Sequence, residues 1–318
     1  LTFTTGTNTL AGADTKIAIG AGGDFEGDVT ITTGRDLNNM TVRLGVANAL
    51  PTTALVTLDG IDGNVDVTEQ WCDLDLNGFD QTLAGLRNIA RTDRLQRVYS
   101  GTAATLTISN SVNYTFGGTL GKVGGDDLSL TKSGAGTFTI SGANSYTGAT
   151  TVTGGTLALG ASDVLADTTE VSIGSATLAA GAGFTDTVGT LDTTGAATIN
   201  LGAGAALAFA DSSAVDWTGG TLNLNGTFVS GASLRFGDGT GTGLTSTQLA
   251  LISATGFSGF GPDASGYLTA TSTGGFSSWI TGTFANGTVP ALQQGANADP
   301  DNDGISNLVE YAVAGQDP

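Results

Sequence analysis

The feature that most constrains this sequence is a four-residue phrase that recurs through its middle at a nearly constant spacing. Each copy begins with Thr, has an apolar second residue, and lies at 137–140, 156–159, 177–180, 198–201 or 221–224. The successive offsets in sequence number are 19, 21, 21 and 23. A second short strand candidate occurs between the copies, at 150–152, 170–173, 188–191 and 206–209. Such regular spacing, with two or three short strands per period, predicts a β-solenoid, whose stacked coils share one core.

Alternation within these strands predicts which side chains face the core. Leu, Ile or Phe would face inward, and Thr or Asn outward. The 51 Gly residues suit the tight turns between strands, because Gly adopts positive φ without strain. A β-sandwich or barrel would also contain short strands and turns, so the number of strands does not separate these folds. The near-constant offset favours the solenoid, since sandwich strands have no reason to repeat one phrase in phase.

Two segments carry a resemblance to a known repeat family. Residues 132–152 read KSGAGTFTISGANSYTGATTV and continue with GGTL at 154–157, and residues 74–86 read LDLNGFDQTLAGL. They resemble the autotransporter-associated β-strand repeat of the PATR type, over about residues 55–230. The resemblance implies an all-β, right-handed parallel β-helix on a secreted or surface-exposed bacterial protein. It says little about activity, because such passengers include both adhesins and enzymes.

The repeats divide the chain into three expected parts. Residues 1–54 repeat less clearly and are expected to form N-terminal coils and a cap, since terminal repeats must close the core. Residues 55–275 are expected to form the β-solenoid repeats. Residues 276–318 are expected to form a C-terminal linker or cap with a calcium loop and a short helix.

The charge balance restricts the partners of the chain. Ten Lys and Arg residues against 29 Asp and Glu give a net charge of −19. Such a surface repels phosphate backbones and anionic lipid, so we expect no nucleic-acid partner and no membrane insertion. The sequence has no His and a single Cys, Cys72, which excludes Ser-His and Cys-His dyads, an intramolecular disulfide and a thiolate zinc site. We expect Cys72 to be a buried, small apolar residue.

A second motif near the C-terminus predicts a calcium site. Residues 299–310 read DPDNDGISNLVE and fit the twelve-residue loop D-x-D-x-D-G-x5-E at every position. Oxygen ligands of this kind suit Ca²⁺. The predicted ligands are Asp299, Asp301, Asp303, the Ile305 carbonyl, Asn307 and Glu310. No full helix is expected before the loop, so it resembles the half-hands of dockerins and thrombospondin type 3 repeats, and its expected role is structural.

An arginine-rich segment is the clearest exception to the acidic composition. Four of the seven arginines lie within eleven residues: Arg87, Arg91, Arg94 and Arg97. The first three have i, i+4, i+7 spacing and would share the face of a helix. They would form a patch for a polyanion or for another copy of the chain. The alternative is that they pair with nearby acidic residues such as Asp80 and Asp93.

These observations lead to a function hypothesis and a rival. We expect an extracellular, non-enzymatic structural or adhesive protein that self-associates into a homo-oligomer or filament, contacts cell-surface glycans and is stabilised by calcium. The rival is a carbohydrate-active β-helix, either a polysaccharide lyase or a binding module. It would need clustered Arg, carboxylate and aromatic residues, and its candidate carboxylate pairs are Asp59/Asp62, Asp73/Asp75 and Asp126/Asp127.

Overall fold

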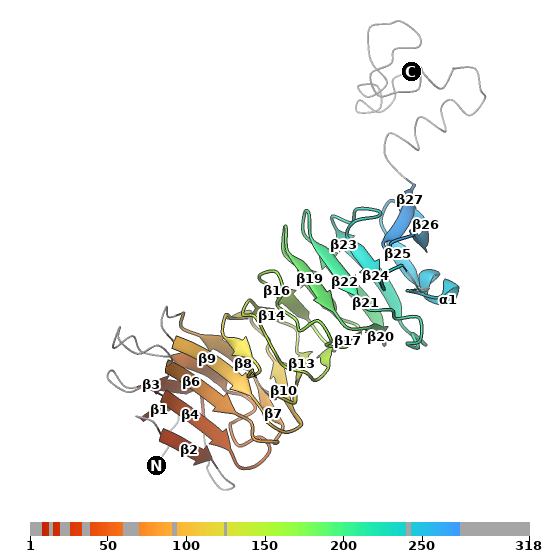
Figure 1. The fold of residues 1–318 in the computed structure, drawn as a ribbon. Helices are drawn as coiled ribbons and strands as arrows, with labels where there is room; N and C mark the ends of the chain where they lie inside the picture. Colours follow the sequence, from red (N-terminus) through yellow and green to blue (C-terminus); the bar gives the residue numbers. More distant parts are fainter. Residues whose placement is uncertain are drawn as a thin grey trace, which may run out of the picture.

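The computed structural model describes residues 8–12, 15–19, 26–33, 39–59, 70–90, 94–123, 126–239 and 243–273. The described chain is nearly all β, and its parallel strands stack into a β-solenoid of about eight turns (Figure 1). This arrangement confirms the predicted all-β solenoid. The predicted calcium loop and the helix after it lie outside the described residues.

The coils place their strands on three sides of the solenoid. The first side is a six-stranded sheet of β7 (Gln81–Leu83), β10 (Ala104–Ser109), β13 (Leu128–Ser133), β15 (Thr150–Val152), β17 (Val171–Ile173) and β20 (Leu191–Thr193). The second side begins with a four-stranded sheet of β1 (Asn8–Gly12), β3 (Val29–Thr33), β5 (Leu55–Asp59) and β8 (Gly85–Asn88). It continues, through contacts between β8 and β11, as a nine-stranded sheet. The nine strands are β11 (Tyr114–Phe116), β14 (Thr137–Ile140), β16 (Thr156–Leu159), β18 (Thr177–Ala180), β21 (Ala196–Leu201), β23 (Thr221–Gly226), β25 (Ile252–Ala254), β26 (Phe257–Pro262) and β27 (Leu268–Ser272).

The third side consists of two separate sheets. One contains β2 (Thr15–Ile19), β4 (Asn39–Leu44), β6 (Gln70–Asp75), β9 (Arg94–Tyr99) and β12 (Thr119–Leu120), and the other contains β19 (Thr185–Val188), β22 (Ala206–Phe209) and β24 (Leu234–Phe236). The helix among the described residues, α1 (Ser246–Leu249), has a capping box formed by Thr245 and Gln248.

The recurring phrase forms neighbouring strands of the second side. Its first four copies pair in register, with Thr137 beside Thr156, Thr156 beside Thr177, and Thr177 beside Thr198. Their second residues form a column of fully buried core side chains: Phe138, Leu157, Leu178 and Ile199. The predicted inward and outward faces of these strands are therefore confirmed.

The fifth copy pairs with a register that differs by two positions from the predicted alignment. Thr198 pairs with Asn223 rather than with Thr221, and Ile199 pairs with Leu224. A shift of two positions leaves every side chain on the same face of the sheet, because strand side chains alternate with a period of two. Leu222 and Leu224 are both buried, so either register would place a leucine in the core beside Ile199.

Close contact between coils makes particular glycines necessary. Gly134 and Gly183 have nearly equal positive φ angles, 74° and 73°. A Cβ at Gly134 would lie 2.5 Å from the Asn110 carbonyl oxygen of the neighbouring coil, whereas a Cβ at Gly183 would meet no atom within 4 Å. We therefore expect Gly183→Ala to lower the free energy of unfolding by about 1 kcal/mol and Gly134→Ala by about 2–4 kcal/mol. Urea denaturation of the two variants measures the difference, and equal losses would contradict the close stacking.

Side chains bridge the gap in the third side between β12 and β19. The Asn144 side chain accepts a hydrogen bond from the Leu120 N–H at 2.7 Å and donates one to the Val164 carbonyl at 2.7 Å. The Asp186 Oδ2 atom then accepts from the N–H groups of Val164 and Leu165 at 2.9 and 3.0 Å. These buried or part-buried bonds hold segments 141–149 and 160–170, which contain no strand, onto the neighbouring coils.

The C-terminal end of the solenoid is covered rather than open. The final strands β26 and β27 pair antiparallel, which ends the parallel ladder of the second side. At the edge of the first side, the N–H of Leu191 on β20 donates to Ser212 Oγ, and the Leu191 carbonyl accepts from Trp217 Nε1 at 3.0 Å. Residues 211–220 thus cap this edge with side-chain hydrogen bonds. A covered edge resists addition of a further strand.

Candidate functional site

The structure separates the four predicted patch arginines instead of gathering them on a helix. Arg87 lies on β8 of the second side, whereas Arg94 and Arg97 lie on β9 of the third side. The expectation of a shared helix face is therefore wrong, because Leu86 and Val98 alternate into the core as strand residues do. Arg91 lies outside the described residues, and the side chain of Arg94 is not described.

Arg97 instead belongs to a cluster on the outer surface of the third side, which we call the charged face. It comprises Arg43 of β4, Asp73 and Asp75 of β6, Arg97 of β9, and Lys122 just after β12. The register brings the members together, since Arg43 pairs with Asp75 and Asp73 pairs with Arg97. Strand alternation turns Cys72 and Leu74 into the core and places Asp73 and Asp75 on the outer side of the sheet, where other side chains cover them.

Ion pairs organise this face. Arg97 Nε and Nη2 donate to the two oxygens of Asp73 at 2.9 and 2.7 Å, a bidentate pairing. Arg43 Nε donates to Asp75 Oδ2 at 2.8 Å. The Asp73 and Asp75 side chains are 1% and 3% exposed, whereas the Arg97 and Arg43 side chains are 14% and 43% exposed. The carboxylates thus lie beneath the guanidinium groups, and solvent meets mainly the cations.

Two aromatic rings complete the charged face. The Arg97 guanidinium lies 5.2 Å from the Trp71 ring centroid, and Lys122 Nζ lies 4.8 Å from the Tyr99 centroid. Both distances suit cation–π attraction. Burial raises the pKa of Tyr99 to about 12, with a further contribution from Asp73 and Asp75, so its phenol remains protonated. Burial is also the main reason that the pKa of Asp73 rises to about 6, against the opposing effect of Arg97. At neutral pH the Asp73 carboxylate is therefore still ionised and paired.

Only part of this face was predictable from the sequence. Arg97 and the Asp73/Asp75 pair were among the predicted candidates, whereas Arg43 and Lys122 were missed. The signal that could have paired Arg97 with Asp73 was their separation in sequence, 97 − 73 = 24 residues, which is the length of one coil in this part of the chain. Arg43 precedes its partner Asp75 by a different offset, 75 − 43 = 32, so a constant period does not reveal it.

The other candidate carboxylates do not form an open pair in the described chain. Asp126 is buried, and its Oδ1 accepts from the Leu128 N–H at 2.9 Å, whereas Asp127 is exposed. Asp59 is half-buried at the end of β5, and Asp62 lies outside the described residues. Cys72 is buried, as expected, and its Sγ lies 3.2 Å from the Ile31 carbonyl oxygen.

The described ranges contain no cluster of side chains typical of a metal site. Within them, no three Asp, Glu, His or Cys residues converge as such a site would require. The six predicted calcium ligands, Asp299 to Glu310, lie outside those ranges. Nor does any described helix have the length and apolar character needed to cross a bilayer.

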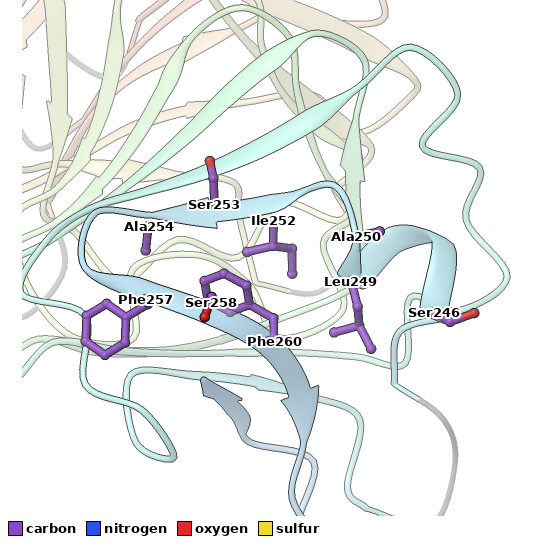
Figure 2. A pocket seen from close by; sticks show the side chains of 10 residues that line it. Ser246, Leu249, Ala250, Ile252, Ser253, Ala254, Phe257, Ser258 and Phe260 are labelled. Atoms are coloured by element: carbon purple, nitrogen blue, oxygen red, sulfur yellow. The ribbon is translucent and has the colours of Figure 1, made fainter. Parts of the chain in front are cut away.

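An apolar pocket of about 490 Å³ lies at the C-terminal end, between α1, β25 and β26. Figure 2 shows Leu249, Ile252 and Phe260 around a common space below β25. Phe257 packs edge-on against Phe228, with 5.0 Å between ring centroids. The described lining of this pocket contains no charged side chain, which separates it in chemistry from the charged face.

Buried polar groups give residues 130–159 a distinctive internal structure. Lys132 occupies a core column between Ile108 and Val152, and its Nζ donates to the carbonyls of Gly134 and Gly154 at 2.9 and 3.0 Å. Burial lowers the pKa of Lys132 to about 8. The buried Tyr146 hydroxyl forms a 2.6 Å hydrogen bond with Thr150 Oγ1. These contacts tie the turns of the coil to its strands.

Comparison with known proteins finds a family match over these same residues. The family described as passenger-associated-transport-repeat matches residues 130–159, which span most of β13 through β16. No curated protein and no solved structure matches the chain. The match is narrower than the resemblance read from the sequence over about residues 55–230. The chain is therefore a β-solenoid in which residues 130–159 are similar to the passenger-associated-transport-repeat.

Proposed function

We propose that the chain is an extracellular or cell-surface passenger whose function is structural and adhesive rather than catalytic. The observation that carries this proposal is the continuous stack of parallel coils that includes the passenger-type repeat at 130–159. Each coil buries its inward side chains against both neighbours, which makes the stack a stiff support. Its outer faces are then available for contact with partners.

Calcium stabilisation of the C-terminal segment is part of this proposal. The support is the sequence of residues 299–310, whose Asp, Asn and Glu oxygens have the spacing of a calcium loop. Glu310 would close the shell with two oxygens, so we expect Glu310→Gln to weaken calcium binding at least tenfold, by an order-of-magnitude argument. Isothermal titration measures this, and Glu170→Gln, which makes the same chemical change at an exposed residue of the solenoid, is the control. Equal affinity in both variants would contradict the loop assignment.

Self-association into a homo-oligomer or filament is also proposed. Because the C-terminal edges are covered, we place the surface for self-association at the opposite end. There, β1 and β2 are the outermost described strands of their sheets. Unpaired strand edges are templates for pairing with another chain. Pairing through this end alone joins two rods, and growth into a filament would require a second contact surface on each rod.

Negative-stain electron microscopy with calcium and with a chelator tests the structural proposal. Elongated rods or filaments are the expected result, and filaments that loosen on chelation would support a structural role for calcium. Sedimentation checks the assembly independently, since polymers would sediment far faster than a single chain. Compact, spherical particles would contradict the proposed function, and a strictly monomeric species in calcium would contradict assembly.

Carbohydrate recognition is the second candidate function, and the charged face favours it. Clustered arginine, carboxylate and aromatic groups are what the carbohydrate-active hypothesis required. Both carboxylates are almost fully buried and bonded to arginines, which supports a binding role more than acid–base catalysis, because a general base must reach the proton of a bound substrate. Incubation with acidic polysaccharides distinguishes the two roles, since a lyase would generate new ultraviolet absorbance and a hydrolase new reducing ends.

A further inference from the structure

We propose that the charged face binds an acidic polysaccharide through Arg43, Arg97 and Lys122. This inference rests on the surface exposure proposed above and names the partner for the adhesive role. Cationic residues are scarce in this chain, whose net charge is −19. Half of the cationic side chains that the structure describes lie on this face; the six are Arg43, Arg87, Arg97, Lys122, Lys132 and Arg235.

The arrangement of charge directs the cations outward. Asp73 and Asp75 are almost fully buried and hold the guanidinium groups from below, whereas Lys122 is exposed and the Arg43 and Arg97 side chains are 43% and 14% exposed. Because the buried carboxylates fix the arginines in place, an anionic ligand would meet groups that are already oriented. Arg43 donates to Asp75 through Nε, and an arginine carries further N–H donors on its terminal nitrogens, which suit carboxylate and sulfate groups.

The spacing of the cations suits a polymer that lies across the strands. Arg43, Arg97 and Lys122 come from β4, β9 and the turn after β12, which belong to one parallel sheet in the order β4-β6-β9-β12. Adjacent strands of a sheet lie about 4.8 Å apart, so the three cations span the width of several strands. A ligand with anionic groups at intervals along an extended chain can contact all three.

The groups beside the cations favour sugar over nucleic acid. Trp71 is half-buried, and its register partner Leu95 is 49% exposed, so an apolar strip adjoins the cations. Sugar rings present C–H surfaces that pack on apolar and aromatic side chains. Duplex DNA carries one charge per ~1.7 Å of its axis and would extend over the acidic remainder of the chain. An acidic polysaccharide carries fewer charges per length and adds apolar contact.

Binding of purified full-length chain to defined polymers tests the proposal. The probes are dextran sulfate and polygalacturonate, with neutral dextran and a short DNA duplex for comparison, at about 0.15 M salt, where the Debye length is about 8 Å. We expect both acidic polysaccharides to bind and the neutral dextran and DNA to bind at least tenfold more weakly. Failure of both acidic polymers to bind, or tighter binding of DNA, would overturn the proposal.

Lys122→Gln and Arg87→Gln form a matched pair of variants. Each removes one positive charge from an exposed side chain, but Arg87 lies on β8, on another side of the solenoid. We expect Lys122→Gln to weaken polysaccharide binding about fivefold, equivalent to about 1 kcal/mol, and Arg87→Gln less than twofold. Equal weakening would mean that net charge alone governs binding and would overturn the assigned site. Thermal unfolding of both variants confirms that they are folded.

The test separates failure of this inference from failure of the proposed function. If the protein forms rods in electron micrographs but binds no acidic polymer, the proposed structural function stands and only the proposed ligand is wrong. Compact particles would contradict the structural function, whatever they bind.

Discussion

Trp217→Ala is expected to lower the free energy of unfolding by about 3–5 kcal/mol, within the range for a large aromatic residue removed from a core. Trp217 is 3% exposed and covers the edge of β20, where its Nε1 donates to the Leu191 carbonyl. The substitution creates a cavity, leaves that carbonyl without its donor and uncovers a strand edge. We therefore also expect concentration-dependent association of the variant, because an uncovered edge pairs with other chains.

Trp217→Phe provides the matched control for this result. It retains an apolar ring but loses the N–H donor, and we expect a loss of about 1–3 kcal/mol with less association. Urea denaturation gives the free energies, and sedimentation velocity gives the associated fraction. A Trp217→Ala variant with wild-type stability and no association would show that residues 211–220 do not seal this end.

Asp186→Ala and Asp186→Asn are expected to change stability in opposite directions at pH 7.5. Asp186 is 3% exposed, its Oδ2 accepts from two backbone N–H groups, and its Oδ1 has no hydrogen-bond partner. Alanine removes the acceptor of both buried donors, so we expect a loss of about 2–4 kcal/mol. Asparagine retains an acceptor without the buried charge, and we expect it to stabilise the protein by about 1–3 kcal/mol.

The effect of Asp186→Asn should depend on pH. Burial is the largest cause that raises the pKa of Asp186 to about 6, from an ordinary value of 3.8. Between these values the folded chain binds the proton more often than the unfolded chain, so this group makes stability fall as pH rises from about 4 to 6. The penalty is complete above about pH 6 and absent below 3.8. Denaturation at pH 4 and 7.5 should show the advantage of asparagine only at the higher pH, and an equal difference at both would refute this account.

The repeat pattern in the sequence was sufficient to predict the solenoid. Inward residues such as Phe138 and Leu157 are recognisable because strand alternation and coil period act together on every copy. The same regularity caused the register error at Thr221, where a shift of two positions buries the same kind of side chain. Periodicity therefore determines which face is buried more reliably than it determines which residues pair.

The charged face was harder to predict because its members come from coils of unequal length. The spacing of Arg87 and Arg91 matches a helix, yet Arg87 lies on a strand, because packing in the core overrides a short local pattern. Arg43 and Lys122 become neighbours of the Asp73 and Asp75 region only after the coils are stacked. The calcium loop remains a prediction, since its residues lie outside the described chain.

The gap in the third side gives this solenoid a site where its sequence can diversify. Within a strand, an inserted residue would shift the register and turn core side chains toward solvent. Segments 141–149 and 160–170 contain no strand and are held by single hydrogen bonds, such as those of Asn144 and Asp186 and that of the Ser145 N–H to the Leu120 carbonyl. An insertion between two such anchors leaves the register of the sheets intact. New surface loops can therefore be acquired there, during evolution or by design, without rebuilding the core.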